Sequence, residues 1–78
     1  DYNLPFIFVL YPNPTSSIIN VKSDKPIFQL RIFDVFGRIV LKTNQTKNIN
    51  IEKFTPGIYS VDLIFLDGSF ATKKIIKY

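Results

Sequence analysis

Apolar and polar residues alternate along much of the chain in short stretches. In the stretch 28–32, the apolar residues Phe28, Leu30 and Ile32 are predicted to share one face, and the polar residues between them the other. A period of two residues is typical of a β-strand that buries one face. A helical period of 3.6 residues persists nowhere over a window of about eleven residues. The pattern therefore predicts an all-β chain.

Turn-forming residues interrupt these stretches about every eight to twelve residues, a spacing typical of β-sandwiches and β-barrels. The clearest interruptions are Pro12-Asn13-Pro14, Asp34-Val35-Phe36-Gly37, Pro56-Gly57 and Asp67-Gly68. The stretches that remain predict seven strands, at residues 6–11, 18–22, 28–34, 38–43, 47–51, 57–66 and 69–77.

Two of the turns are predicted to close tight hairpins. The stretch Asp34-Val35-Phe36-Gly37 has Asp at the first and Gly at the fourth position of a type I turn, where Gly can take a positive φ and form a bulge. Asp67-Gly68 is typical of a two-residue type I′ turn.

That type I′ turn would also determine the register of the last two strands. It pairs Phe65 with Phe70, Leu63 with Thr72, Val61 with Lys74 and Tyr59 with Ile76, and it places Asp62 opposite Lys73. Lys74 would then follow the apolar face, where its ammonium could still reach solvent at the rim of the sheet. A single bulge would turn it outward instead.

The stretch Phe54-Thr55-Pro56-Gly57-Ile58-Tyr59 is the most informative for the fold. Pro-Gly favours a type II turn. A Tyr just after such a corner, in an immunoglobulin-like sandwich, can bond its hydroxyl to the upstream backbone. We therefore predict an immunoglobulin-like β-sandwich of about seven antiparallel strands. Its predicted core is Ile19, Val21, Leu30, Ile32, Val40, Ile49, Ile51, Tyr59, Val61, Leu63 and Ile76.

The composition argues against several classes of function. The chain of 78 residues has no His and no Cys, so the commonest general base, the commonest metal ligand and the thiol nucleophile are missing. We predict no enzyme activity and no catalytic, cofactor-binding or metal-binding residues. The net charge of +4 comes from dispersed lysines, apart from Lys73, Lys74 and Lys77, and predicts a solvated surface rather than a nucleic-acid interface. No stretch approaches the ~20 apolar residues of a membrane span.

Four motifs occur in order: Tyr11-Pro12-Asn13-Pro14, then Asp34 to Arg38, then Phe54 to Tyr59, and a last strand that contains Lys73-Lys74-Ile75-Ile76-Lys77. Together they resemble the type A C-terminal sorting domain of the type IX (Por) secretion system of Bacteroidota. The resemblance covers residues 9–78, and residues 1–8 are predicted to be a linker or an extra edge strand. Two positions depart from the family pattern, since Phe54 replaces the usual Leu and Tyr78 follows the terminal basic residue.

The resemblance implies a secretion label with no chemistry of its own. Its implied partners are the outer-membrane secretion translocon, a sortase-like peptidase that removes the domain, and an N-terminal cargo domain of the same chain. The implied location is the periplasm in transit, and then the medium or the cell surface.

The resemblance also names candidate site residues. Translocon recognition is assigned to Lys73, Lys74, Ile75, Ile76 and Lys77, in a strand that could be recognised by strand addition or by a charged groove. The alternative is that these lysines protect a sheet edge from aggregation. The side chains of Lys73 and Lys77 are expected to point to solvent. The other motif residues are predicted to be mainly structural: Tyr11, Pro12, Asn13, Pro14, Asp34, Gly37, Arg38, Gly57 and Tyr59.

Two other functions are compatible with the same fold. An immunoglobulin-like accessory module could bind carbohydrate or a cell surface. A structural linker domain could pack on its neighbour through an exposed apolar patch of Phe6, Phe8 and Leu10.

Overall fold

The computed structural model describes residues 8–78, and every regular element in this range is a β-strand. The strands are β1 (Phe8–Tyr11), β2 (Ile18–Ser23), β3 (Ile27–Phe33), β4 (Ile39–Thr43), β5 (Ile49–Asn50), β6 (Gly57–Phe65) and β7 (Phe70–Lys77). They form a three-stranded sheet in the order β1-β2-β5 and a four-stranded sheet in the order β4-β3-β6-β7, in which every neighbouring pair is antiparallel.

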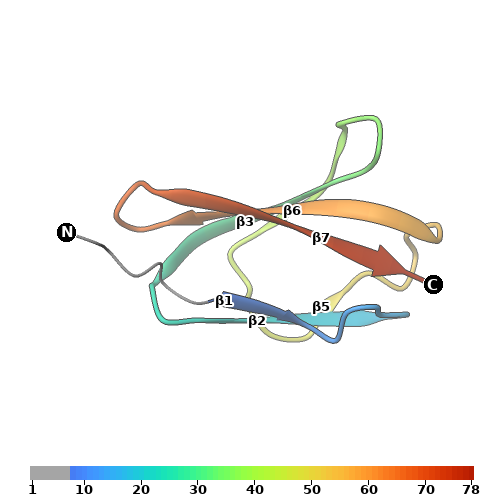
Figure 1. The fold of residues 1–78 in the computed structure, drawn as a ribbon, viewed down its shortest axis with the longest axis horizontal. Helices are drawn as coiled ribbons and strands as arrows, with labels where there is room; N and C mark the ends of the chain where they lie inside the picture. The colour runs from blue at the N-terminus through green and yellow to red at the C-terminus, as the bar shows by residue number, and fades with distance from the viewer. Residues whose placement is uncertain (1–7) are drawn as a thin grey trace.

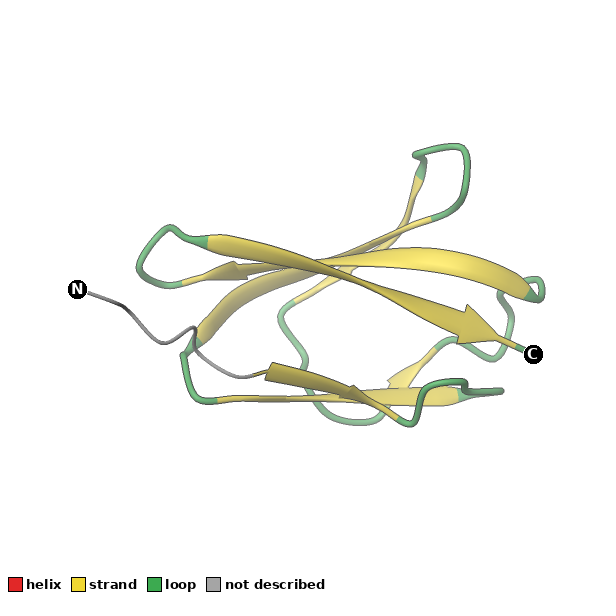
Figure 2. Ribbon diagram, viewed as in Figure 1, coloured by secondary structure: helices red, strands yellow, loops and turns green. Residues whose placement is uncertain are grey.

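The two sheets lie face to face in a sandwich (Figures 1 and 2). The predicted all-β fold of seven antiparallel strands is confirmed. The first two residues of the predicted strand 6–11 lie outside the described range. Between residues 8 and 78, no helix has the length and the hydropathy that crossing a membrane requires.

One apolar layer fills the space between the sheets. Its buried members are Leu10, Ile19, Val21, Leu30, Ile32, Ile49, Ile51, Tyr59, Val61, Leu63, Phe65 and Ile75. The prediction was wrong at Val40 and Ile76, which are 38% and 47% exposed. It also missed Leu10, Phe65 and Ile75. A chain of this size has room for a single layer only, so each of these positions carries a large share of the stability.

A bulge in β3 explains one error in the predicted faces. The pairing of β3 with β6 shifts between Ile27 and Gln29, so Phe28 is left over and is 56% exposed. Ile27 packs against the core in its place. An extra residue in one strand reverses the alternation of faces beyond it. The sequence alternates strictly from Leu30 back to Phe28, so it gave no sign of the bulge.

The β3–β4 pairing shifts once more, between Ile32 and Phe33, where Ile32 pairs with Leu41 and Phe33 with Ile39. Val40 is the residue left over by this shift, and Leu41 packs against the core instead. β4 is an edge strand, so the outer side of Val40 has no neighbouring strand to cover it.

The hairpin between β6 and β7 differs from the predicted two-residue turn. The Gly68 N–H donates to the Phe65 carbonyl at 3.0 Å, and the Phe65 N–H donates to the Ser69 carbonyl at 2.9 Å. Gly68 has a φ of 89°, so the loop is a type I turn followed by a left-handed Gly in a bulge.

This loop of three residues shifts β7 by one position relative to β6. Tyr59 pairs with Ile75 rather than Ile76, and Ser60 pairs with Lys74. A shift of one residue moves every side chain to the opposite face. Ile75 is therefore buried and Lys74 faces outward. This is the second arrangement considered from the sequence, in which a bulge turns Lys74 away from the apolar face. Asp62 lies opposite Thr72 and not opposite Lys73.

The apolar patch expected for a linker domain is not formed by its described members. Leu10 is 6% exposed and belongs to the core. Phe8 is half-buried, and its ring meets the Phe65 ring edge-on at 6.3 Å between centroids. Phe6, the third residue of that patch, lies outside the described range.

The register of β7 can be tested with two neighbouring residues. We expect Ile75→Ala to lower the free energy of unfolding by about 2–5 kcal/mol, because it leaves a cavity in the core. Ile76→Ala should cost about 1 kcal/mol or less, because its side chain is half-exposed on the outer face. Urea unfolding of both variants measures the difference, and the reverse order would show that the sequence-predicted register is the true one.

Candidate recognition site

The Asp34 carboxylate organises the hairpin between β3 and β4. It accepts hydrogen bonds from the Phe36 N–H at 2.9 Å, the Arg38 N–H at 3.0 Å and the Arg38 Nε at 2.8 Å. The Gly37 N–H donates to the Asp34 carbonyl at 3.0 Å, and Gly37 has a φ of 81°, which suits Gly. The predicted type I turn with its positive-φ Gly is therefore confirmed, and the D-x-x-G-R motif is its hydrogen-bonding unit.

These contacts lower the pKa of Asp34. Partial desolvation of the carboxyl raises the pKa, but the hydrogen bonds from the Arg38 backbone and side chain and from the Phe36 N–H outweigh it. The net effect is a pKa below the usual value, so the carboxylate stays ionised, and holds the loop, to a lower pH than an ordinary Asp would.

The tip of this hairpin presents two large apolar side chains to solvent. Val35 is 69% exposed and Phe36 is 79% exposed. The Arg38 guanidinium lies 5.3 Å from the centroid of the Phe36 ring, within the range of a cation–π contact. Arg38 is held by Asp34 in turn, so the loop keeps its exposed side chains in one arrangement.

The Tyr59 hydroxyl ties the start of β6 to the connection from β5. It donates to the Thr55 carbonyl at 2.5 Å, and its ring packs on Phe54 with centroids 5.2 Å apart. The predicted tyrosine corner is present. The predicted type II turn at Pro56-Gly57 is not, because Gly57 has a φ of 155° rather than roughly +80° and is already the first residue of β6.

The Y-P-N-P motif closes part of the outer edge of β7. Asn13 donates from Nδ2 to the Lys74 carbonyl at 3.2 Å and accepts at Oδ1 from the Ile76 N–H at 3.1 Å. The Thr15 N–H then donates to the Ile76 carbonyl, and the Tyr78 N–H donates to the Thr15 carbonyl, both at 2.9 Å. The Asn13 amide thus takes the place of a backbone unit, and the segment extends the sheet beside β7.

The three terminal lysines differ in their surroundings. Lys73 Nζ lies 5.0 Å from the centroid of the Phe8 ring and 3.4 Å from the Phe8 carbonyl oxygen, so this side chain reaches across to β1. Lys77 is 6% exposed, and its Nζ donates to the Tyr78 backbone oxygen at 2.8 Å. The expectation that Lys77 points to solvent was wrong, because the shifted register turns it inward and its stem covers the core end. Lys74 alone points outward from the sheet.

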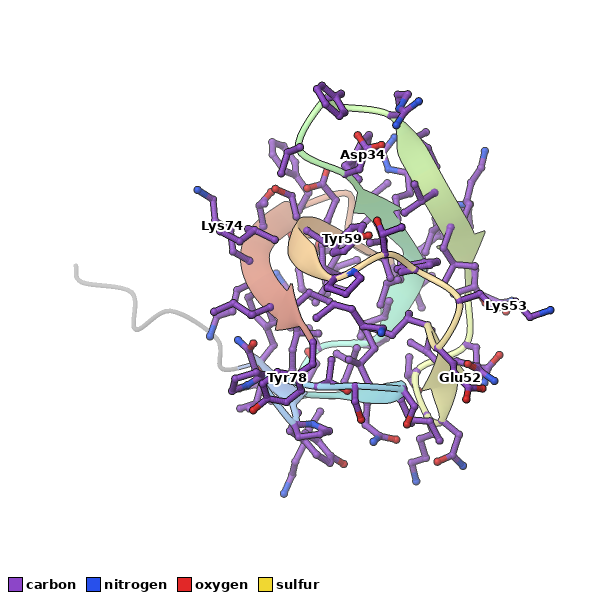
Figure 3. The ribbon with its side chains drawn as sticks, turned by 90° about the vertical axis from the view of Figure 1, so that its right-hand side faces the viewer. Asp34, Glu52, Lys53, Tyr59, Lys74 and Tyr78 are labelled. Carbon is purple, nitrogen blue, oxygen red and sulfur yellow. The ribbon has the colours of Figure 1, made fainter. Side chains whose placement is uncertain are left out.

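The structure gathers the motifs at one end of the sandwich. In Figure 1 this is the end where β7 finishes, β6 begins and the β3–β4 hairpin projects. Figure 3 views this end directly, with Asp34 above Tyr59 and Lys74 to the left of it. One hollow of about 410 Å³ lies between the β3–β4 hairpin and the stretch 53–59. A second, of about 650 Å³, lies between this hairpin and Lys74.

Of the five residues assigned to recognition, the structure exposes Lys73, Lys74 and Ile76, and it buries Ile75 and Lys77. The sequence did not single out Val35, Phe36 and Ile58 as site residues, although they lie inside or beside the motifs. The sequence could have indicated them only by their apolar character at exposed positions. Val35 and Phe36 lie in a turn, and Ile58 lies on the strand face predicted to be exposed. Residues 8–78 contain no group of three His, Cys, Asp or Glu side chains placed to bind a metal ion.

Comparison with known proteins adds one finding. A family model described as "Secretion system C-terminal sorting domain" matches residues 9–78, which is nearly the whole chain. No curated protein and no solved structure matches it. The family match agrees with the resemblance that the four ordered motifs predicted.

The Asp34 contacts predict a pH dependence. The folded pKa is lower than the unfolded value of about 4, so the stabilisation is complete above about pH 4 and is lost as the pH falls through the folded pKa. We expect Asp34→Asn to lower the melting temperature at pH 7 and to differ much less from the unsubstituted domain at pH 2. An equal difference at both pH values would contradict this role of the charge.

The Asn13 contacts predict a local effect at the end of β7. Asn13→Ala should lower the free energy of unfolding by about 1 kcal/mol and speed the exchange of the Ile76 amide proton, since both hydrogen bonds are lost. Asn44→Ala, an exposed Asn in a loop, is the control and should leave this amide protected. Unchanged exchange of Ile76 in Asn13→Ala would show that water replaces the side chain without loss.

Proposed function

The chain belongs to the family of secretion system C-terminal sorting domains, whose role is that of a type IX secretion signal, and we propose that it carries an N-terminal cargo domain across the outer membrane. The observation that supports this best is the gathering of motifs distant in sequence at one exposed end of the sandwich. Exposed apolar side chains and an outward-facing lysine are not needed to build the buried core, so folding alone does not explain why they lie together at this end.

The proposed route runs in three steps. The cargo and its folded sorting domain first reach the periplasm of a member of the Bacteroidota. The domain then engages the translocon through its motif-bearing end. A sortase-like peptidase finally cuts the chain before the sandwich, and the cargo is released or stays at the cell surface. The domain is a substrate in this reaction, and family membership makes it a sorting signal rather than a catalyst.

Within the last strand, the proposed recognition residues divide into two groups. Lys74 and Ile76 face outward and can contact a partner while the domain stays folded. Ile75 and Lys77 face inward and contribute by holding β7 in place. The Lys73 side chain covers the gap between β7 and β1 by lying over the Phe8 ring. Edge protection, the alternative function of the lysines, fits Lys73 better than Lys74, because only the former lies along the gap between the two sheets.

The proposal is tested by fusing a signal peptide and a reporter to residues 1–78 in a host with the type IX machinery. We expect the reporter in the medium or at the cell surface, with a mass lower than that of the intact fusion because the domain has been cleaved. In the same host without the translocon, the reporter should stay in the periplasm at full mass.

Retention of the reporter in the periplasm of the competent host would contradict the proposal, and the adhesion module would then be the better account. Export at full mass would contradict only the cleavage step. A fusion carrying Ile75→Asp, which places a charge in the core, controls for a requirement that the domain be folded.

A further inference from the structure

A groove on the outer face of the four-stranded sheet is not explained by folding. It lies over a row of three paired residues, Phe33 on β3, Ser60 on β6 and Lys74 on β7. The β3–β4 hairpin forms one wall through Val35, and Ile58 lies in the lining beyond Ser60. The hollow measures about 650 Å³, which is enough for one or two side chains of a partner.

The charges in this groove do not cancel. Both of its carboxylates are occupied, since Asp34 binds Arg38 and Asp62 binds Arg31 and Thr72. Lys74 is the only cation of the lining, and within residues 8–78 its ammonium has no carboxylate partner. The free charge of the groove is therefore positive, and it selects for an anionic group.

The apolar side chains around the groove are exposed and held in place. Val35 is 69% exposed and Ile58 is 50% exposed. The three hydrogen bonds to the Asp34 carboxylate hold the loop that carries Val35, so a partner would lose little entropy in ordering it. An apolar wall on a rigid hairpin, next to a free cation, is the arrangement of a docking site.

We propose that this groove docks a protein of the secretion machinery, by taking an apolar side chain between Val35 and Ile58 while a neighbouring carboxylate of the partner pairs with Lys74. The inference rests on the proposed function and names the surface that carries it. A protein surface is favoured over an anionic lipid because the lining combines apolar side chains with a single lysine, whereas a lipid surface would need an extended basic face.

The two matching hairpins of the domain offer a matched pair of variants. Val35 and Leu66 both follow the first residue of a type I turn that ends in a left-handed Gly, and both are exposed, at 69% and 65%. Lys74 and Lys42 are both outward lysines of the same sheet without a carboxylate partner in the described range, and Lys42 lies outside the groove. Leu66→Ser and Lys42→Gln are therefore the controls for Val35→Ser and Lys74→Gln.

In the reporter assay we expect the exported fraction to fall about tenfold for Val35→Ser and for Lys74→Gln, as for the loss of one central anchor. Leu66→Ser and Lys42→Gln should be exported normally. The melting temperatures of all four purified domains show that each variant folds. Normal export of the two groove variants, while the intact fusion is exported, would overturn the groove proposal and leave the proposed function standing. Failure of the intact fusion would count against the proposed function itself.

The partner class is tested by a photo-crosslinking amino acid placed at position 35 or position 66 of the exported fusion. We expect an adduct with an outer-membrane protein from position 35 only, and we expect Lys74→Glu to abolish it. Equal adducts from both positions, or none from position 35, would overturn the proposal. Dimerisation of the purified domain that Val35→Ser abolishes, or binding to phosphatidylglycerol vesicles that Lys74→Gln abolishes, would assign the groove to a second copy or to a membrane and would also overturn it.

Discussion

The three-residue loop between β6 and β7 determines what the last strand presents to solvent and what it buries. Its left-handed Gly68 adds one residue to the turn and moves β7 by one position. Ile75 then completes the apolar layer, Lys77 covers the end of the core, and Lys74 faces outward. A two-residue turn would have exchanged these faces, with a lysine in the core and Ile75 in solvent. Both the stability of the sandwich and the chemistry of its outer groove therefore depend on this one turn.

A sandwich with one apolar layer and no cross-links must also close its edges by polar contacts. The Asn13 amide and the Thr15 backbone pair with the end of β7, and the Lys73 side chain bridges the remaining gap to Phe8 on β1. The two prolines of the Y-P-N-P motif suit this position, because they donate no N–H and end β1 before the chain passes along the edge of β7 and returns to β2. The motif is thus an edge-closing device that binds the same strand whose outer face carries the free lysine.

Sequence patterns predicted the number of strands, most of the core and, to within one or two residues, the strand bounds that the structure describes, because alternation and turn residues are local signals. They failed wherever one extra residue entered a ladder: at Phe28, at Val40 and at the β6–β7 loop. A bulge changes which face a residue occupies without changing its local composition, so only the pairing of distant strands reveals it. The burial of Lys77 and the bonds of Asn13 to β7 were hidden for the same reason, since each depends on contacts across the sequence.

The motif residues and the proposed contact residues are different sets that occupy the same loops. Internal hydrogen bonds occupy the polar groups of Asp34 and Tyr59, and the turn requires the positive φ of Gly37. These residues therefore have few free groups with which to contact a partner. The side chains of Val35 and Ile58, which lie inside the same motifs, take no part in these hydrogen bonds or in the turn geometry. Their neighbours hold them in position. The motif residues are therefore best understood as the support, and Val35 and Ile58 as the surface that the proposed partner contacts. A substitution in the support should disturb folding and export together, whereas one at Val35 should reduce export from a domain that melts as before.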